Sequence, residues 1–370
     1  MMAQRQLPIR CALMRGGTSK GAYFLAEDLP ESPAARDAML LSIMGSPDPT
    51  QIDGVGGGHS LRSKVAIVQR STEDGVNVDF LFAQVAVDRA SVDTSPNCGN
   101  ILAGVGPFAI ERKLVEPRDG TTRVRVRILN TGSVADLDVE TPGGVVTYAG
   151  DAAIAGVPGT GSPIRIGFRN VEGSVCGSLL PTGRARDQVE GVAVTCIDNG
   201  MPVVLVAARS LDRSGLESVE QLNNDSELKR RLESIRLAAG ALMNLGDVSG
   251  RVVPKVSLVA PAANGGCVLT RNFIPKVCHT AIGVFAAVSV ASACVLPGSV
   301  TDGIARVPDE DQQLLSIEHP TGEFTVHLDV DRSGALPHFR SVGLLRTARM
   351  LFDGTVFAHS DYRDRNQEAL

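Results

Sequence analysis

The sequence predicts an α+β protein built from two similar halves, each a curved, mainly antiparallel β-sheet wrapped around one central α-helix. Runs of β-branched residues dominate the chain, and several of them alternate apolar with polar side chains, as strands do. Two segments, residues 98–114 and 280–295, instead show helical patterns that are apolar on nearly every side. A helix that is apolar all round has to be covered by other structure, so we expect each segment to lie inside the sheet of its own half.

The other elements follow from local patterns along the chain. A helix is expected over residues 33–44, because Ser32 can cap it and Pro33 suits the first helical position. An amphipathic helix is expected over residues 227–245, after Ser226. Strands are expected at six runs: Ile9–Met14, Lys64–Gln69, Val76–Val87, Arg123–Leu129, Val203–Ala207 and Val256–Ala260.

The length of 370 residues suggests about two domains, which agrees with the two apolar helices. We place the join near residues 180–183, so that the first half is 1–182 and the second half is 183–342. Residues 344–358 read as a strand, a turn and a strand. The C-terminal segment 343–370 is expected to return to the first half.

Charge and cysteine usage limit what the protein binds and where it works. The net charge is −5, so no basic field is available for nucleic acid. The N-terminus lacks the apolar core of a signal peptide, and the longest apolar run, Ala281–Leu296, is too short to cross a bilayer. Seven cysteines without a CxxC pair indicate reduced thiols in the cytoplasm. Six scattered histidines argue against a metal site.

The segment Asn97-Cys98-Gly99-Asn100 stands where the first apolar helix begins. A helix N-terminus offers unpaired N–H groups and a partial positive charge, which favour a thiolate on Cys98 or a carboxylate bound beside it. The position of Cys98 therefore favours a thiol that faces a ligand. A cysteine is also often a small buried apolar side chain, and that interpretation stays open.

Lys64 opens one of the predicted strands and shares a strand face with Ala66 and Val68. Its amine is therefore expected on the buried side of the sheet, where it could take and return a proton. The alternative is a strand-end lysine whose ammonium reaches out to water. The glycine-rich run 54–58 just before it allows a ligand to approach the backbone closely, which supports the catalytic interpretation.

Candidate anion-binding groups lie around these two residues. In the run 15–21, an arginine, two hydroxyl residues and a lysine stand among glycines, a composition that fits a carboxylate better than a plain turn. The second half offers weaker candidates at Arg271 and at His319–Thr321, and each of these is as consistent with an ordinary turn.

The residues quoted so far resemble the PrpF family, which is built on the diaminopimelate epimerase fold. The motifs that carry the resemblance run along nearly the whole chain: Met14–Phe24, Met44–Pro47, Gln51–Gly54, Ser63–Val65, Asn97–Arg112, Met243–Asp247, Ser316–Gly322 and Leu345–Arg349. The resemblance implies two diaminopimelate epimerase-like domains with the active site in the cleft between them, and neither cofactor nor metal. In the parent fold each central helix begins with a cysteine. Cys98 keeps the first of these, whereas Thr280 takes the place of the second.

The resemblance also implies an isomerase or tautomerase of an unsaturated tricarboxylate, with no nucleic-acid or membrane partner and with a homodimer left open. The motifs are nearest in wording to the branch that acts on 4-oxalomesaconate in bacterial degradation of protocatechuate, gallate and lignin-derived aromatics. Isomerisation of methylaconitate or aconitate in propionate metabolism is the alternative, and a non-catalytic polycarboxylate-binding protein and a racemase are weaker ones. Lys64 matches the family's proposed catalytic lysine, and Cys98 is either its partner acid or a positioning group. The expected substrate-binding residues are Arg15, Thr18, Ser19, Lys20, Ser63, Asn97, Gly99, Asn100, Arg271, Thr280, His319 and Thr321.

Overall fold

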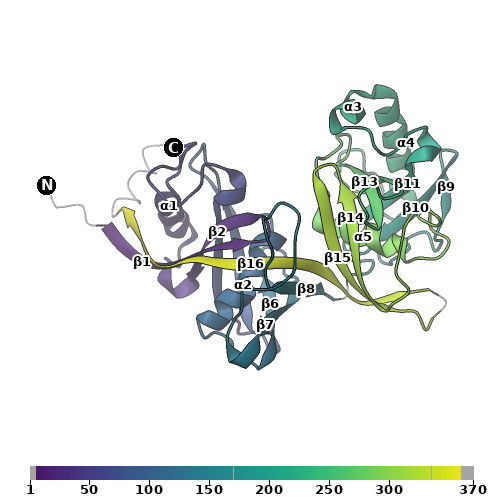
Figure 1. The fold of residues 1–370 in the computed structure, drawn as a ribbon. Helices are drawn as coiled ribbons and strands as arrows, with labels where there is room; N and C mark the ends of the chain where they lie inside the picture. The colour runs from purple at the N-terminus through teal and green to yellow at the C-terminus, as the bar shows by residue number, and fades with distance from the viewer. Residues whose placement is uncertain (1–5, 170, 335, 360–370) are drawn as a thin grey trace. The chain divides into compact units, whose positions relative to one another are not determined.

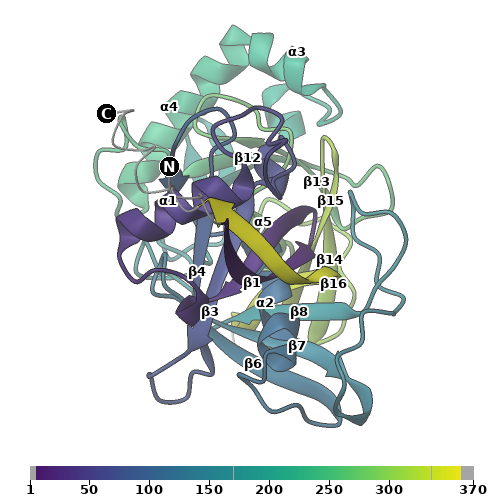
Figure 2. The same ribbon diagram turned by 90° about the vertical axis from the view of Figure 1, so that its left-hand side faces the viewer.

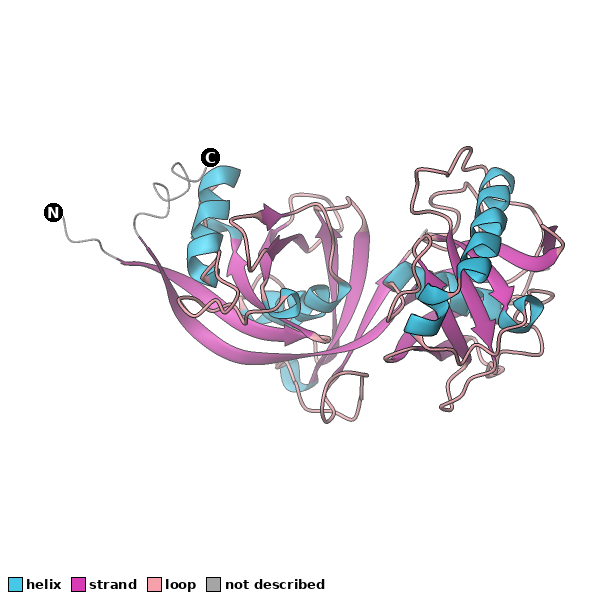
Figure 3. Cartoon of the chain, turned by 90° about the horizontal axis from the view of Figure 1, so that it is seen from above, coloured by secondary structure: helices cyan, strands magenta, loops and turns pink. Residues whose placement is uncertain are grey.

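Strands are the main regular elements of the computed structural model, which describes residues 6–169, 171–334 and 336–359 (Figure 1, Figure 3). The chain divides into a first unit, which comprises residues up to Ile166 and from Arg346 onward, and a second unit, Gly167–Leu345. The predicted α+β class is confirmed, because in each unit a mainly antiparallel sheet packs around one apolar helix. Residues 1–5 and 360–370, which the sequence assigns to the first half, lie outside the described residues.

The first unit is a ring of strands around α2 (Gly99–Glu111). Its strands are β1 (Gln6–Gly16), β2 (Ser19–Leu25), β3 (Lys64–Arg70), β4 (Val78–Val85), β6 (Gly120–Ile128), β7 (Val134–Thr141), β8 (Pro163–Phe168) and the end of β16 (His338–His359), with the short β5 (Val92–Asp93) beside β4. They follow the order β1-β2-β3-β4-β6-β7-β8-β16, and β16 also pairs with β1, which closes the ring. Helix α2 contacts β1, β2, β3, β4, β6 and β7, so it lies inside (Figure 2).

Two features of α2 suit it to this enclosed position. All residues from Ile101 to Ile110 are buried, in keeping with their apolar sequence. Gly104 lets the helix approach β2 closely, since a β-carbon there would lie 2.4 Å from the Tyr23 hydroxyl. That hydroxyl donates a hydrogen bond of 2.6 Å to the Ile101 carbonyl and so ties the first turns of α2 to β2. On the other face of the sheet, α1 (Pro33–Met44) packs its buried side chains against β1–β4.

The second unit surrounds α5 (Val284–Cys294) with a sheet of the same kind. Its strands are β9 (Asp187–Val189), β10 (Val192–Asp198), β11 (Pro202–Ala207), β12 (Lys255–Ala260), β13 (Val268–Phe273), β14 (Gln312–His319), β15 (Gly322–Asp331) and the start of β16. The order is β16-β15-β14-β13-β12-β11-β10-β9. Helices α3 (Val219–Asn224) and α4 (Ser226–Leu242) cover the outer face, where Leu228, Leu232 and Ile235 join the core. Short 3-10 helices lie at Ala26–Asp28, Ser60–Arg62, Pro142–Gly144 and Ala208–Leu211.

The two units repeat one topology. The first unit contains the hairpins β1–β2, β3–β4 and β6–β7. Consecutive hairpins are joined by parallel pairs, β2 with β3 and β4 with β6, and the connections contain α1 and α2, respectively. In the second unit the hairpins β10–β11, β12–β13 and β14–β15 are joined in the same way, with α3 and α4 in the first connection and α5 in the second. Each hairpin of one unit therefore has a counterpart in the other, and so does each helical connection between hairpins.

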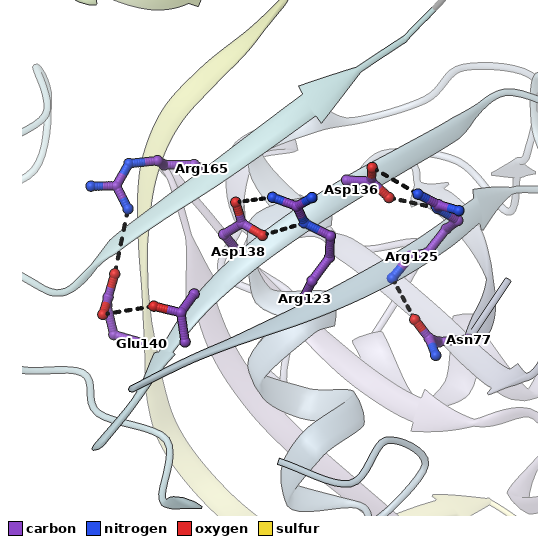
Figure 4. Close-up of polar contacts among 8 residues, drawn as sticks. Asn77, Arg123, Arg125, Asp136, Asp138, Glu140 and Arg165 are labelled. Carbon is purple, nitrogen blue, oxygen red and sulfur yellow. Dashed lines mark hydrogen bonds and ion pairs between the residues drawn. The ribbon is translucent and has the colours of Figure 1, made fainter. Parts of the chain in front are cut away.

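Ion pairs cover the outer face of β6–β8 (Figure 4). Arg123 pairs with Asp138 at 2.7 Å and Arg125 with Asp136 at 2.7 Å, directly across the β6–β7 ladder. Arg127 continues the row and binds Asp79 of β4 at 2.8 Å. Opposite charges on cross-strand positions stabilise the pairing, and they keep this outer face polar.

The structure differs from the predicted elements mainly at their ends. Helix 33–44 is confirmed as α1, whereas the helix predicted from Ser226 as cap is capped by Asp225, whose carboxylate accepts from the Leu228 N–H at 2.9 Å. The predicted helix 280–295 begins only at Val284, because the Ala281 N–H donates to the His279 ring at 3.0 Å and forms a local turn instead. Similarly, the helix predicted over residues 98–114 is observed as Gly99–Glu111, with Cys98 as its N-cap.

The C-terminal segment is one continuous strand rather than a strand, a turn and a strand. Within this segment, Asp353 and Gly354 pair with Ala12 and Cys11 of β1 beyond a local register shift, so the strand continues through them. Arg112 at the end of α2 binds Asp353 at 2.5 Å and holds it in the strand. Among the helices that the structure describes, none has the length and apolar character needed to cross a membrane.

Candidate functional site

Lys64 and Cys98 meet inside the first unit. Lys64 is the first residue of β3 and is buried, with 8% of its surface exposed. Cys98 is the N-cap of α2, the helix that fills the ring. The Lys64 Nζ lies 3.7 Å from the Cys98 Sγ, so the structure brings together the two residues that the sequence nominates as catalytic.

Gln84 fixes the position of the Lys64 ammonium. It lies directly across the β3–β4 ladder from Lys64, and its Oε1 accepts from the Lys64 Nζ at 2.9 Å. Its Nε2 donates to the carbonyls of Ser63 at 2.8 Å and Ser60 at 3.0 Å, which sets the amide with its oxygen toward the amine. Sequence reasoning missed Gln84, although the cross-strand register of two predicted strands could have indicated it.

Two further groups shape the electrostatics around this pair. The Lys64 Nζ lies 5.0 Å from the centroid of the Phe82 ring, within the range of a cation–π interaction. The first N–H groups of α2 have no partner within the helix and carry its partial positive charge. The amine, the thiol and these amides together form a place where a carbon acid could lose a proton and where the resulting anion would be stabilised.

Asn100 connects three elements at the start of α2. Its Nδ2 donates to the Thr18 hydroxyl at 2.9 Å, and its Oδ1 accepts from Arg346 of β16 at 3.2 Å. Arg346 is buried, yet the sequence did not single it out as a site residue. Because Arg346 is 246 residues from Asn100 in the sequence, only the long-range pairing of β16 with β1 brings it here.

The glycines of the run 15–21 make room for α2. A β-carbon on Gly16 would lie 2.2 Å from the Asn100 carbonyl oxygen, and one on Gly17 would lie 2.1 Å from the Asn100 Oδ1. Gly17 also has a φ of 51°, which glycine adopts most readily. The glycines of this run therefore seat the helix N-terminus, and carboxylate binding by the run stays a prediction.

The hydroxyl residues of this region have different surroundings. Ser19 is 1% exposed, and its Oγ has no hydrogen-bond partner among the described residues. The Ser63 Oγ accepts from Gln51 at 2.7 Å, so it supports the loop before β3. Asn97 is exposed, and Gly99 is the first residue of α2.

Arg15 and Lys20 lie on the sheet face opposite to Lys64. Lys20 is next to Gly21, the ladder partner of Lys64, and neighbouring residues of a strand point to opposite faces. Arg15 pairs with Lys20 across β1–β2, so it shares that outer face. Its guanidinium donates to the carbonyls of Gly17 and Thr347, both at 3.0 Å, and its pKa is lowered by burial and by the charge of Arg349.

In the second unit, three of the four expected residues come together. The Thr321 hydroxyl donates to the Thr280 carbonyl at 2.8 Å, and the Thr321 N–H donates to the His319 Nδ1 at 3.3 Å. Burial lowers the pKa of His319. In the described part of the chain, Arg271 makes no hydrogen bond to them: it lies on the strand face of Leu269 and Phe273, and its Nε donates to the carbonyl of Glu217, just before α3, at 2.9 Å. Within the described ranges, no three His, Cys, Asp or Glu side chains gather as a group able to hold a metal ion.

Comparison with known proteins places this geometry in context. The sequence model of the PrpF protein family matches residues 6–359. The chain is 56% identical over 355 residues to the 4-oxalomesaconate tautomerase of Pseudomonas putida, covering 96% of this chain and 97% of that protein. It is 57% identical over 347 residues to the (4E)-oxalomesaconate Delta-isomerase of Novosphingobium sp. (strain KA1), covering 94% of this chain and 96% of that one. The crystal structure of a methylitaconate-delta-isomerase superposes with a TM-score of 0.84 at 31% identity, covering 96% of this chain and 97% of that one.

Proposed function

We propose that this chain, which belongs to the PrpF family, is an isomerase that shifts a proton and a double bond in 4-oxalomesaconate. The observation that carries the proposal is the Lys64 amine held 3.7 Å from the Cys98 thiol at a helix N-terminus. The high identity to two relatives named for this substrate, over nearly the whole chain, supports the choice of substrate.

The chemistry follows from the position of the amine. In its neutral form, Lys64 removes the acidic proton from a carbon next to a conjugated carbonyl or carboxylate. The electron pair of that C–H bond then spreads over the adjacent π-system as a dienolate, which the N–H groups of α2 stabilise. A proton returns to a different carbon, from Lys64 or from the Cys98 thiol, and the double bond moves. When the thiol gives the proton, the one taken by Lys64 passes to the Cys98 thiolate and restores both groups. The proton count is unchanged, so no oxidant or reductant is needed.

Substrate carboxylates are assigned to the groups around the first turn of α2. Asn97, Gly99 and Asn100 supply amides there, and Ser19 supplies a hydroxyl that has no hydrogen-bond partner among the residues that the structure describes. Thr18 positions Asn100. For the second unit we retain Thr280, His319 and Thr321 as candidates, since they lie together at one turn.

The biological setting is proposed on the same grounds. The reaction would serve bacterial degradation of protocatechuate, gallate and other lignin-derived aromatics by 4,5-cleavage. The described cysteines are all free thiols, which fits a cytoplasmic enzyme. A homodimer is the assembly to test by analytical ultracentrifugation.

Proton NMR of the enzyme with freshly prepared 4-oxalomesaconate in deuterium oxide tests the proposal. Migration of the double bond with deuterium at one defined carbon is expected. The Lys64→Ala variant should lose at least about a thousandfold in kcat, while Cys98→Ser should lose less. Lys276→Ala, an exposed lysine paired with Glu233, is the matched control and should keep full activity.

Two results would contradict the proposal. Full activity of folded Lys64→Ala would remove the amine from the mechanism. Turnover of aconitate-type substrates without turnover of 4-oxalomesaconate would assign the chain to the methylaconitate branch instead.

A further inference from the structure

The repeated topology gives Lys64 a counterpart in the second unit. Lys64 is the first residue of β3, the strand that follows α1 in the first unit. Lys255 opens β12, the strand in the same place of the second repeat. Each lysine pairs in parallel with the strand before that helical connection, Lys64 with Gly21 and Lys255 with Val203. Sequence reasoning did not single out Lys255.

The helix N-termini correspond as well. In the first unit a β-carbon on Gly17, in the first hairpin turn, would collide with Asn100, the second residue of α2. In the second unit a β-carbon on Gly200, also in the first hairpin turn, would lie 2.5 Å from Phe285, the second residue of α5. The N-cap of α2 is Cys98, and the N-cap of α5 is Gly283. Gly283, rather than Thr280, is therefore the structural counterpart of Cys98.

Lys255 stands beside the N-terminus of α5, as Lys64 stands beside that of α2. A β-carbon on Gly283 would lie 3.6 Å from the Lys255 Nζ, and among the described residues it would meet no other atom within 4 Å. The amine therefore borders an open space at the start of the helix. Because glycine leaves that space empty, no thiol is available here for proton transfer, but a ligand can reach the first amides of α5.

The charge in this place is not compensated by the described residues. Lys255 has no hydrogen bond or ion pair to any of them, and burial lowers its pKa with no acidic group opposing the shift. The helix N-terminus beside it adds a further partial positive charge. A partly buried ammonium next to a helix N-terminus is electrostatically unfavourable unless an anion binds there.

A second group points to the same kind of ligand. Asn272 of β13 is 1% exposed, and its Nδ2 is buried without a hydrogen-bond partner among the described residues. Its Oδ1 accepts from Ser257 at 2.8 Å, so the amide is oriented with the Nδ2 left as a donor. Asn272 pairs with Ser257, which is two residues after Lys255 on the same strand face. Asn272 and Lys255 therefore have their side chains on the same face of neighbouring strands, and an oxygen acceptor would satisfy the Asn272 Nδ2, which has no partner among the described residues.

We infer that Lys255, Asn272 and the first amides of α5 form a carboxylate-binding site in the second unit. Its ligand class is a di- or tricarboxylate, and naming the substrate as that ligand rests on the proposed function. This site binds and does not transfer a proton, because Gly283 stands where the first unit has Cys98.

Binding of tricarballylate, a saturated tricarboxylate that cannot isomerise, tests the inference by isothermal titration calorimetry. Lys255→Met should weaken its binding about tenfold or more, because a charged hydrogen bond is lost. Lys255→Arg should retain most of the affinity, and the exposed control Lys276→Met should retain all of it. Without anion, Lys255→Met should melt at the same temperature as the wild type or higher, since an uncompensated ammonium is removed. With saturating tricarballylate the wild type should melt higher than the variant.

Unchanged tricarballylate affinity in folded Lys255→Met overturns the inference. Steady-state kinetics on 4-oxalomesaconate then distinguish a failure of the inference from a failure of the proposed function. If the wild type turns over 4-oxalomesaconate, Lys255→Met should raise KM with a smaller change in kcat, and an unchanged KM would show that the substrate does not use this site. If the wild type fails to turn it over while Lys255→Met still loses tricarballylate binding, the proposed function falls and the carboxylate site stands.

Discussion

Gln84 determines where the Lys64 amine can act. Its Nε2 donates to the carbonyls of Ser60 and Ser63, and these bonds orient the side-chain amide so that its Oε1 faces Lys64. The amine is therefore held at one side by a neutral acceptor, with the Cys98 thiol on another. Gln84 therefore orients the amine through a neutral acceptor.

Gln84→Met should lower kcat by up to about a hundredfold, because a displaced catalytic group loses its alignment with the reacting carbon. KM should change much less, since Gln84 is a positioning residue and does not hold the substrate. Steady-state kinetics on 4-oxalomesaconate measure the two constants, and thermal melting checks the fold. A raised KM with an unchanged kcat would instead indicate that Gln84 helps to bind the substrate.

The extent to which the site could be predicted depends on the distance between its residues in the sequence. Lys64 and Cys98 stand in local patterns, a strand start and a helix start, so the sequence alone nominates them. Gln84 and Arg346 become site residues only through strand register, which no local pattern encodes. Arg15 and Lys20 were nominated from the composition of one loop, whereas the alternation of the strand places them on the other face.

At the scale of elements, the first hairpin turn and the start of α2 are fitted to each other. Gly17 lies within contact of Asn100, and Asn100 in turn binds Thr18 of the same turn. The turn therefore sets the position of the helix N-terminus, and through it that of Cys98.

Gly17→Ala should reduce both stability and activity. Its φ of 51° costs about 1–2 kcal/mol for any residue with a β-carbon, and the added carbon would also displace Asn100. Gly120→Ala is the matched control, because its φ is 85° while no atom lies within 4 Å of the added carbon. Urea unfolding and kcat should show that the control loses stability only, whereas Gly17→Ala loses more stability and also kcat. Equal behaviour of the two variants would mean that the contact with Asn100 is unimportant.

The ion pairs on the outer face of β4, β6 and β7 are expected to make the first unit sensitive to acid. Burial tends to raise the pKa of Asp79, but hydrogen bonds from Arg127, Ser71 and Gln69 outweigh it, and the pKa is lowered. A carboxylate whose pKa is lowered by folding stabilises the fold above its unfolded pKa of about 3.9. That stabilisation is lost as the pH falls through the folded pKa.

Asp79→Asn should therefore destabilise the protein by about 2 kcal/mol at pH 7, and this difference from the wild type should shrink below about pH 4. Asp138→Asn is the comparison, because its partner Arg123 is half exposed and the pair should contribute less than about 1 kcal/mol. Urea unfolding at a series of pH values measures both. A difference that does not change with pH would show that packing, and not the charge of Asp79, is responsible.

On the scale of the whole molecule, the sequence predicted two halves but not the extent of their repetition. The two apolar helices could be found because each is a continuous local pattern. The matching order of hairpins could not, because parallel pairs such as β2–β3 and β11–β12 join strands separated by whole helices. Lys255 was missed for the same reason: it resembles Lys64 in its place in the topology and not in its neighbouring residues.

Strand β16 belongs to both units, and a truncated chain should show what it contributes. Its residues 338–344 pair with β15, whereas residues 348–359 pair with β1. A chain that ends at Leu345 should leave β1 with an exposed edge, which favours aggregation. Hydrogen exchange should find the first unit poorly protected and β10–β13 still protected, while full protection of β1 and β2 would contradict this.

The same strand sets an order of events during synthesis. The second unit is one uninterrupted stretch of chain, Gly167–Leu345, whereas the first unit needs residues from both ends. The ribosome therefore finishes the second unit before it has made the strand that closes the ring of the first. The stretch that carries Lys64 and Cys98 is translated early, yet its sheet is completed last. Until then, one edge of β1 is unpaired and can pair with another chain unless the growing chain or a chaperone covers it.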